Sequence, residues 1–339
     1  MPSIPNPLIT VFIPVFNGSY YLPETLESLK RQTFSAFEVV LIDDHSTDAS
    51  LAVLNNQTAD DNRFRVMQTP VNLGNAAKVL KYGLDFVKGE YFVYSSQDDL
   101  FSHDWLASMH ARAVEMNADA TIPDLIFYNP SLRENERALI GLRGNKDIIL
   151  TGKDAFISSL DWTIPGNALW KTSIIRGVGW FDFGMNADEY SVRVFFLNCE
   201  RVVFSGGIFY YRQNNPDAIT KKLSIQSFDR PYTDLRLWLL AMEFNLDIKV
   251  QRFLINRSVD GLMNYTTLAY TRNLSTAIPK IKKTFEQYEV NNALPWLSRN
   301  KGNDFRARLS EVALRSYALF VIISLLQAVA RRAIQWSKR

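Results

Sequence analysis

The sequence predicts an α/β protein: a doubly wound, mostly parallel sheet with helices on both faces, followed by a helical C-terminal region. Apolar segments of strand length alternate four times with segments of helical spacing in the N-terminal part of the chain. Two of these strands end in adjacent carboxylates. Beyond about residue 221, strand patterns disappear and helical spacing continues.

The composition is that of a folded protein with room for two domains. The chain has 339 residues, which we divide into residues 1–220 and residues 221–339. Hydrophobic residues make up 47% and charged residues 22%, which argues against a disordered chain. The net charge of +3 gives no general argument for nucleic-acid binding. The single cysteine, Cys199, excludes an internal disulfide, and no secretory signal is expected at residues 1–10, so we expect a cytoplasmic protein.

The first four strands are expected at residues 8–13, 38–42, 64–68 and 91–95. Each is short, apolar and rich in β-branched or aromatic residues, as buried parallel strands are. Helices are expected at residues 23–32, from a cap at Ser46 or Thr47 through Leu54, and at residues 72–87 and 102–117. In each, apolar residues recur every three or four positions and give one buried face.

The middle of the chain is more irregular. We expect a strand at residues 125–128, a loop at residues 133–147, and a helix that starts with a Thr151–Asp154 capping box. Residues 201–205 and 208–212, joined at Gly206-Gly207, predict a hairpin. Helical segments follow at residues 228–250, 251–270, 278–288 and 304–336.

The strand at residues 91–95 is followed by Asp98 and Asp99. Open α/β sheets bind ligands at the carboxyl ends of their strands. Two adjacent carboxylates repel, so one tends to take up a proton unless a divalent cation lies between them. Such a cation could in turn hold a diphosphate. The alternative is an acidic turn that caps the next helix.

Two further sites suggest a nucleotide. Asp43 and Asp44 end the second strand, where a carboxylate can accept the N3 proton of uracil or a ribose hydroxyl, or can simply cap a helix. The segment Asn72-Leu73-Gly74 is expected to open a helix, with Lys78 in its first two turns. A helix N-terminus beside a cation suits a phosphate, and the alternative is a solvated lysine.

Asp188 and Glu189 precede an apolar helical segment. A carboxylate there can act as general base towards a hydroxyl, or it can only stabilise the helix end by its charge. Trp162, Trp170 and Trp180 are candidates for stacking on a sugar face, or for the core. The sequence has no glycine fingerprint of a dinucleotide fold after the first strand, no P-loop and no nucleophile elbow.

Together these segments resemble the family 2 glycosyltransferases, which are inverting enzymes of the GT-A fold. The resemblance covers about residues 8–220. Its matching segments are residues 9–17, 28–48, 72–74, 83, 89–91, 97–99, 166–170, 179–182, 188–189 and 209–212.

The resemblance implies roles for individual residues. Pro14, Phe16 and Asp44 would line the nucleobase and ribose site, with Asp44 as the uracil partner. Asp98 would approach the ribose or the metal, and Asp99 would bind Mg²⁺ or Mn²⁺. The implied reaction is a single displacement that moves a sugar from a nucleotide sugar, expected to be a UDP-sugar. The acceptor would be a saccharide or lipid-linked saccharide in bacterial surface-polysaccharide synthesis.

The chain departs from the family pattern at three places. Gly18 stands where the family often has Glu, and Gln97 replaces the first acid of the metal motif, so that the first ligand would be an amide. The family's Glu-Asp pair is reversed: position favours Glu189 as the base, and chemical type favours Asp188. These departures leave a second hypothesis, a catalytically silent sugar-nucleotide-binding or scaffolding protein with the same fold.

The C-terminal segment 316–330 is strongly apolar, and Arg331, Arg332, Lys338 and Arg339 follow it. It is shorter than the ~20 residues of a spanning helix. We expect a helix lying in the interface of an anionic membrane, on the cytoplasmic face, or alternatively a helix packed in the core or in a dimer.

Overall fold

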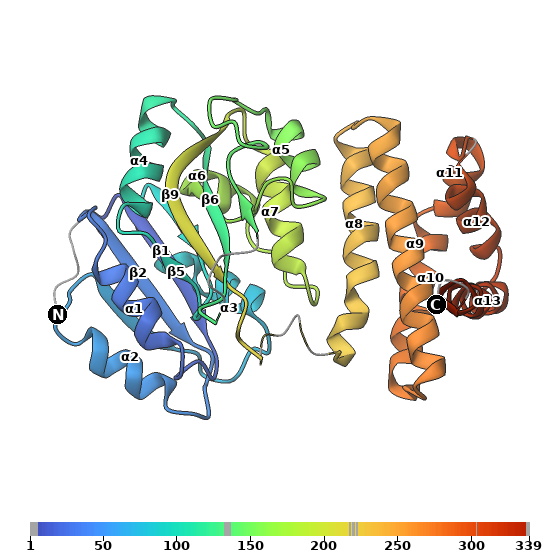
Figure 1. Cartoon of the computed structure of the whole chain (residues 1–339), viewed down its shortest axis with the longest axis horizontal. Helices are drawn as coiled ribbons and strands as arrows, with labels where there is room; N and C mark the ends of the chain where they lie inside the picture. The colour runs from blue at the N-terminus through green and yellow to red at the C-terminus, as the bar shows by residue number, and fades with distance from the viewer. Residues whose placement is uncertain are drawn as a thin grey trace. The chain divides into compact units, whose positions relative to one another are not determined.

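The computed structural model describes residues 6–131, 137–216, 218, 221, 223–302 and 304–336, with the side chains of residues 331–336 left out. The chain forms two compact units. One comprises Met1–Phe183 and Ala187–Lys221, and the other comprises Gly184–Asn186 and Lys222–Arg339. Figure 1 shows the sheet in the blue-to-yellow unit and the helices α8 to α13 in the other.

The first unit is built on a nine-stranded sheet, in which the order is β3-β2-β1-β4-β8-β6-β9-β5 and β7 pairs with β6. The strands are β1 Ile9–Val15, β2 Phe37–Asp43, β3 Phe64–Gln68, β4 Tyr91–Tyr94, β5 Leu100–Phe101, β6 Ala120–Tyr128, β7 Ala138–Leu139, β8 Leu169–Lys171 and β9 Val202–Arg212. Strands β1 to β4 pair in parallel, as the sequence predicted, and β8 runs antiparallel to β4 and β6.

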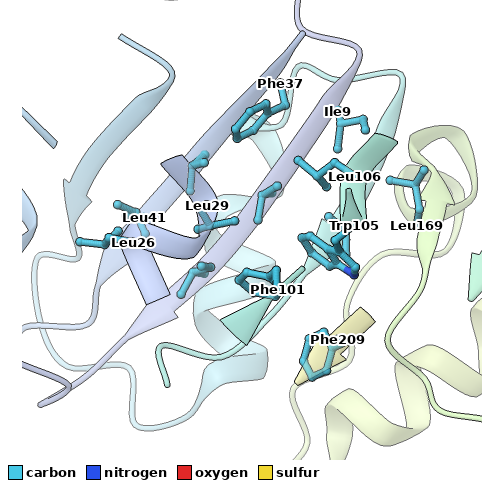
Figure 2. Close-up of a cluster of buried hydrophobic side chains, with 14 of the residues drawn as sticks. Ile9, Leu26, Leu29, Phe37, Leu41, Phe101, Trp105, Leu106, Leu169 and Phe209 are labelled. Carbon is cyan, nitrogen blue, oxygen red and sulfur yellow. The ribbon is translucent and has the colours of Figure 1, made fainter. Parts of the chain in front are cut away.

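The helices of this unit are α1 Leu22–Lys30, α2 Ser50–Thr58, α3 Ala76–Gly83, α4 Trp105–Glu115, α5 Gly152–Ser159, α6 Thr172–Val178 and α7 Ala187–Leu197, with a 3₁₀ turn η1 at Leu84–Phe86. They cover both faces of the sheet. Ile9 and its same-face neighbours pack with Leu26 of α1 and Leu106 of α4 (Figure 2). On the opposite face, a Cβ atom at Gly83 of α3 would lie 2.2 Å from the Phe12 ring.

The predicted hairpin at residues 201–212 is wrong. This segment is the single strand β9, which runs parallel to β6. Gly206 and Gly207 lie where the register between the two strands shifts, and a Cβ atom at Gly207 would come within 2.7 Å of the Trp105 Cα. The glycine is therefore needed for close approach to α4, which is a second common reason for glycine in a strand.

Two local predictions need correction, and a third is confirmed. The helix expected at residues 72–87 begins at Ala76, and Asn75 caps it by accepting a hydrogen bond from the Lys78 amide. Neither Ser46 nor Thr47 caps α2; instead the Asp48 Oδ1 accepts from the Ser50 amide at 2.9 Å. The predicted cap of α5 is confirmed, with the Asp154 amide donating to the Thr151 hydroxyl.

The predicted strand at residues 125–128 is the end of the longer β6. Within the predicted loop at residues 133–147, the short strand β7 pairs with β6, and residues 132–136 lie outside the described part of the chain.

The second unit is helical, as expected. Its helices are α8 Arg230–Glu243, α9 Ile248–Thr271, α10 Ile278–Val290, α11 Ala293–Asn300, α12 Phe305–Ala313 and α13 Tyr317–Trp336, with 3₁₀ turns η2 Ile225–Asp229 and η3 Ser275–Ala277. The single helix expected at residues 304–336 is interrupted between α12 and α13, and α11 was not predicted. Among the described helices, none combines the length and the apolar character needed to span a membrane.

Candidate functional site

The carboxyl ends of β1, β2 and β4 meet at one edge of the sheet. Val15 pairs with Asp43, and Phe12 pairs with Tyr94, so the loops after these three strands are neighbours. The loop after β1 is bonded to the loop after β2, because the Asn17 amide donates to Ser46 Oγ at 3.0 Å. This is the edge at which open α/β sheets bind their ligands.

Asp43 and Asp44 are both buried at the end of β2. The Asp43 Oδ2 accepts hydrogen bonds from the Ser46 amide at 3.1 Å and from Gln68 Nε2 at 2.9 Å. The Asp44 Oδ1 accepts from the Leu73 amide at 2.8 Å, and its Oδ2 accepts from the Gly74 amide at 3.2 Å. Both carboxylates therefore organise loops, and their contacts with a nucleobase or ribose stay predictions.

The segment Asn72-Leu73-Gly74 does not open a helix, which corrects the expected phosphate site. Asn72 donates its side-chain amide to the Asp44 carbonyl at 2.8 Å, and the segment forms a turn closed on Asp44 before α3 begins. Lys78 lies in the first turn of α3 with an exposed side chain. A phosphate contact by Lys78 stays a prediction.

The expected nucleobase platform lies in the loop after β1. Phe16 is 45% exposed, and Pro14, at the end of β1, is partly buried. An exposed aromatic ring beside buried strand ends can stack on a base. Tyr20, which is 82% exposed two residues beyond Gly18, is a second such ring that the sequence reasoning missed.

The Gln97 side chain binds the loop after β1, and its role as an amide ligand of a metal stays a prediction. Its Oε1 accepts from the Phe16 amide at 2.8 Å, and its Nε2 donates to the Phe16 carbonyl at 3.0 Å. Both polar atoms of this side chain therefore bind the backbone of the β1 loop.

The two carboxylates after β4 have different environments. Asp98 is half-buried, and its Oδ2 accepts from the Asn215 amide nitrogen at 2.7 Å. Asp99 is buried, and its Oδ1 accepts from the backbone amide of Arg212 at 3.1 Å. Burial, and then the charge of Asp98, raise the pKa of the Asp99 carboxyl well above its ordinary value.

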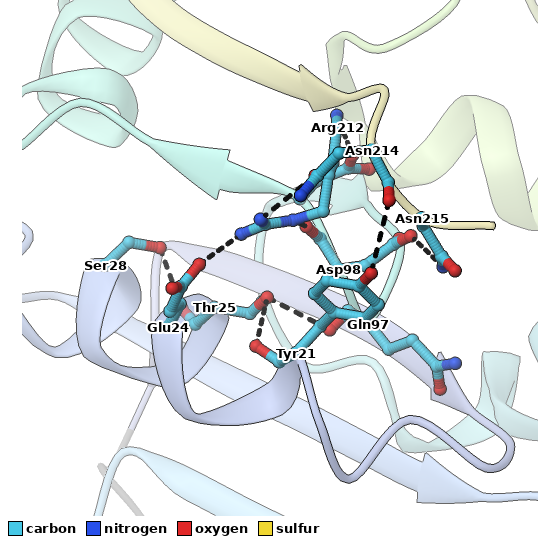
Figure 3. Close-up of polar contacts among 10 residues, drawn as sticks. Tyr21, Glu24, Thr25, Ser28, Gln97, Asp98, Arg212, Asn214 and Asn215 are labelled. Atoms are coloured by element: carbon cyan, nitrogen blue, oxygen red, sulfur yellow. Dashed lines mark hydrogen bonds and ion pairs between the residues drawn. The ribbon is translucent and has the colours of Figure 1, made fainter. Parts of the chain in front are cut away.

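Arg212, at the end of β9, holds this acidic turn (Figure 3). Its Nε donates to the Asp98 carbonyl at 2.6 Å, and its Nη2 forms an ion pair with Glu24 of α1. Its guanidinium carbon also lies 4.9 Å from the centre of the Tyr21 ring. The arginine therefore ties the turn that carries both carboxylates to α1 and β9.

The donor set at this turn fits a divalent cation that also binds a ligand. Two carboxylates stand on adjacent residues, and a cation would relieve the repulsion that, after burial, helps to raise the pKa of Asp99. Within the described residues no cluster of three or more acidic, histidine or cysteine side chains could form a complete protein cage. A cation at Asp98 and Asp99 would thus take its remaining ligands from water or from phosphate oxygens.

The second acidic pair lies in the first turn of α7. Burial first, and then the charge of Glu189, raise the pKa of Asp188 to about 6. Glu189 forms an ion pair with the buried Arg193, which also donates to the Ser159 carbonyl at 2.8 Å. Of this pair, Asp188 is the carboxylate with the raised pKa, and it forms no ion pair with any of the described residues.

Tyr211 is influenced by the charges of both acidic pairs, and the sequence reasoning did not single it out. Burial first, and then the charges of the 98–99 and 188–189 pairs, raise its pKa to about 12. Both acidic pairs therefore act on the protonation of the same phenol. Trp162 stacks on Tyr211 at 6.3 Å between ring centres, whereas Trp170 and Trp180 are buried in the core.

Comparison with known proteins agrees with this architecture. The solved structure of residues 1–349 of TarS from S. aureus, in complex with UDP-GlcNAc, superposes with a TM-score of 0.65 at 17% identity, covering 91% of each chain. The sheet and its C-terminal helices thus define a protein of the GT-A type, and the predicted fold class is confirmed.

Residues 10–177 match the family model described as glycosyl transferase family 2. Glycosyltransferase GlyG of Streptococcus pneumoniae is 27% identical over 290 residues, which cover 78% of this chain and 89% of GlyG. A poly(ribitol-phosphate) beta-glucosyltransferase of Bacillus spizizenii is 30% identical over 119 residues, or 34% of this chain and 19% of that protein. The chain belongs to the family 2 glycosyltransferases and is a glycosyltransferase.

Proposed function

We propose that this enzyme transfers a sugar from a UDP-sugar to a saccharide or lipid-linked saccharide acceptor in cell-surface polysaccharide synthesis. The observation that supports the proposal is that the charges of the 98–99 and 188–189 pairs both raise the pKa of Tyr211. The 98–99 pair suits the binding of a cation that also binds the diphosphate, and the 188–189 pair can supply a general base. The likeness of the fold to TarS, solved with UDP-GlcNAc, supports the choice of donor, and the relative named for poly(ribitol-phosphate) supports a polymer acceptor.

The donor would lie along the loops after β1, β2 and β4. Phe16 would stack on the nucleobase, and the half-buried Asp98 would reach a cation, with the buried Asp99 behind it. Mg²⁺ or Mn²⁺ bound there supplies positive charge to the departing diphosphate. Arg212 holds this turn with its backbone amide, which donates to the Asp99 carboxylate, and with its Nε, which donates to the Asp98 carbonyl.

Asp188 is the proposed base. The acceptor oxygen forms a bond to the anomeric carbon while the bond between that carbon and the diphosphate oxygen breaks, and the hydroxyl proton passes to Asp188. A base with a pKa of about 6 is largely ionised at neutral pH, yet it binds a proton more readily than an ordinary aspartate. Glu189 is the weaker candidate because Arg193 holds its carboxylate.

We further propose that α13 contacts the cytoplasmic face of the membrane. Its residues Ile322, Leu326 and Val329 are spaced at helical intervals and are 54%, 62% and 66% exposed. Basic residues follow in the sequence at positions 331, 332, 338 and 339. An apolar stripe with basic neighbours suits the interface of an anionic membrane.

Release of UDP from UDP-sugars, with Mn²⁺ or with a chelator, tests the enzymatic proposal. The wild-type protein should turn over with Mn²⁺, and Asp98→Asn and Asp188→Asn should each reduce the rate at least about 100-fold. Asp60→Asn, an exposed carboxylate on the surface beyond α2, is the matched control. Binding of UDP without turnover, with every UDP-sugar and a saccharide acceptor, would instead support the silent sugar-nucleotide-binding protein.

A further inference from the structure

The helical C-terminal unit contains a cavity of about 570 Å³ along one face of α9. Its walls come from the first residues of α8, from α9 and from the start of α12, which all belong to that unit. The volume lies within the range of ~300–1,000 Å³ that small-molecule sites occupy. Nothing in the proposed transfer reaction uses this cavity.

The cavity wall is rich in charge. Its cationic side chains are Arg230, Lys249, Arg252, Arg257 and Arg306, and its carboxylates are Asp234, Asp260 and Asp304. The cations outnumber the carboxylates, so the wall carries a net positive charge. A concave surface with an excess of one sign of charge concentrates ligands of the opposite sign.

The carboxylates of the wall already have interaction partners. Asp234 forms an ion pair with Arg257 at 2.6 Å. Asp304 caps α12, since its Oδ1 accepts from the backbone amide of Arg306 at 2.8 Å, while its Oδ2 accepts from the Asn256 side chain at 3.3 Å. With five cations against three carboxylates, the wall keeps an excess of positive charge.

Within the described part of the chain, no carboxylate pairs with Arg230, Lys249, Arg252 or Arg306. Arg252 is nevertheless fixed in position, because its Nε donates to the Asn300 carbonyl at 2.7 Å. Its guanidinium lies over Gly302, where a Cβ atom would be 3.6 Å from Nη2. The Nε bond leaves both Nη groups of this arginine for other acceptors, and such a planar fork matches the oxygens of a phosphate.

Non-ionic groups complete the wall. Phe253 is 47% exposed, and the Arg257 guanidinium lies 5.3 Å from the centre of its ring. Asn264 contributes an exposed amide side chain. An aromatic ring and an amide beside arginines provide stacking and hydrogen bonding for a sugar ring next to its charged group.

We infer that this cavity is a binding site for a phosphate-bearing saccharide. Arg252 and Arg306, with Lys249 and Arg230, hold the phosphate, and Phe253 contacts the sugar ring. The inference concerns binding in the C-terminal unit only and does not depend on the proposed donor or base.

Isothermal titration of the full-length protein with glucose 6-phosphate, in low salt and with UDP and Mn²⁺ saturating, tests the site. Arg252→Gln with Arg306→Gln should weaken binding at least tenfold. Lys282→Gln with Lys283→Gln, two exposed lysines of α10, removes the same charge elsewhere in this unit and should leave the affinity unchanged. Glucose itself should bind at least tenfold more weakly than glucose 6-phosphate.

A second arm distinguishes the source of the phosphate. Phosphatidylglycerol vesicles are offered in place of glucose 6-phosphate. If they bind the wild-type protein but not the variant of Arg252 and Arg306, and glucose 6-phosphate does not bind, the phosphate belongs to a lipid headgroup. The inference of a saccharide ligand is then wrong. Equal affinity of the two double variants for glucose 6-phosphate, or no measurable heat with the wild-type protein, would overturn the site. Unchanged affinity for UDP and an unchanged melting temperature show that the variants are folded.

Discussion

Gln97 occupies the space that a side chain at position 18 would need. A Cβ atom at Gly18 would lie 2.4 Å from the Gln97 Cδ, and the Gln97 amide binds both the amide and the carbonyl of Phe16. These are two of the positions at which the chain departs from the usual family pattern. The glycine makes room for the glutamine, and the glutamine fixes the β1 loop, so the two departures form one structural unit.

This relationship predicts that Gly18→Ala displaces the Gln97 side chain. The clash involves the end of the Gln97 side chain. We therefore expect Gln97 to lose its two hydrogen bonds to Phe16 while the protein stays folded. We expect a loss of about 1–3 kcal/mol in the free energy of unfolding and several-fold weaker UDP binding. Chemical denaturation and calorimetric titration with UDP measure these effects.

The matched comparison is the double variant Gly18→Ala with Gln97→Ala. With the glutamine removed, the alanine at position 18 meets no clash, so the two changes should cost less together than the sum of their separate costs. Additive losses would show that the two residues are not coupled. Ser19→Ala, next to Gly18, tests whether any change in this loop weakens UDP binding.

The parallel half of the sheet was predictable because its strands have a simple signature. β1 and β2 are buried along nearly their whole length, so their sequences read as continuous apolar segments. β9 was misassigned because Gly206-Gly207 looks like a hairpin turn, and its true partner, β6, lies far away in the sequence. The strands β5 and β8, of two and three residues, are too short to carry a pattern.

The candidate site, too, could be predicted from the sequence only in part. Acidic strand ends are visible in the sequence, so Asp43, Asp44, Asp98 and Asp99 could be located at one edge of the sheet. The bonds of Arg212 to the acidic turn depend on the parallel placement of β9, which the sequence did not predict. Local patterns therefore predicted which groups carry charge, whereas long-range pairing determines what holds them.

A second prediction concerns the pH dependence of sugar transfer. The pKa of Asp188 is raised to about 6, so the base is mostly protonated below that pH. The rate constant kcat/KM should rise with pH through about 6 and then level off, because only the ionised form accepts the proton. Asp188→Asn should abolish this dependence together with at least about 99% of the activity.

Glu189→Gln is the control for the base. Because the charge of Glu189 contributes to the raised pKa of Asp188, its removal should move the midpoint of the pH profile to lower values, and activity should remain. The opposite result, loss of activity in Glu189→Gln and retention in Asp188→Asn, would make Glu189 the base.

The same group has an opposite effect on stability. A carboxyl whose pKa is higher in the folded than in the unfolded protein stabilises the fold at low pH, and this contribution is lost as pH rises through the folded value. Asp188→Asn should therefore raise the melting temperature at pH 8 more than at pH 4. A lower melting temperature of this variant at pH 8 would contradict the raised pKa.

A third prediction concerns Arg212 as a positioning residue. Arg212→Met removes the donor to the Asp98 carbonyl and leaves the shape of the side chain largely intact. We expect a loss of about 2–4 kcal/mol in the free energy of unfolding. The ratio of the UDP affinities with and without Mn²⁺ should fall at least tenfold. Arg31→Met, which removes a surface ion pair with Glu27, should change neither quantity by more than about 0.5 kcal/mol.

A purely structural role of Arg212 would lower stability alone. The distinguishing measurement is the UDP affinity with and without Mn²⁺, recorded at a temperature where the variant is fully folded. An unchanged ratio of the two affinities would show that Arg212 does not position the acidic turn. Arg212→Lys should restore part of the stability but little of the metal dependence, because lysine lacks the planar fork of donors.

A fourth prediction separates the two carboxylates of the acidic turn. Asp98 is the more exposed, so Asp98→Asn should raise the Mn²⁺ concentration needed for half-maximal UDP binding at least tenfold. Asp99→Asn should have the smaller effect on Mn²⁺ and should increase stability near neutral pH, because burial and Asp98 already raise the pKa of this carboxyl. UDP binding that is equally strong with a chelator in the wild-type protein would exclude the proposed cation.

The fifth prediction concerns α13 and the membrane. Leu326→Glu with Val329→Glu places two charges on the exposed apolar stripe, whereas Phe320, on the opposite side, is buried and is left unchanged. Co-sedimentation of the full-length protein with phosphatidylglycerol vesicles should fall at least tenfold in this variant. Val290→Glu, at an exposed position of α10, adds charge outside the stripe and should bind vesicles as the wild-type protein does. If all three proteins bind vesicles equally, and light scattering shows dimers of the wild-type protein and of Val290→Glu but not of the stripe variant, the stripe is a dimer contact and the membrane proposal is wrong.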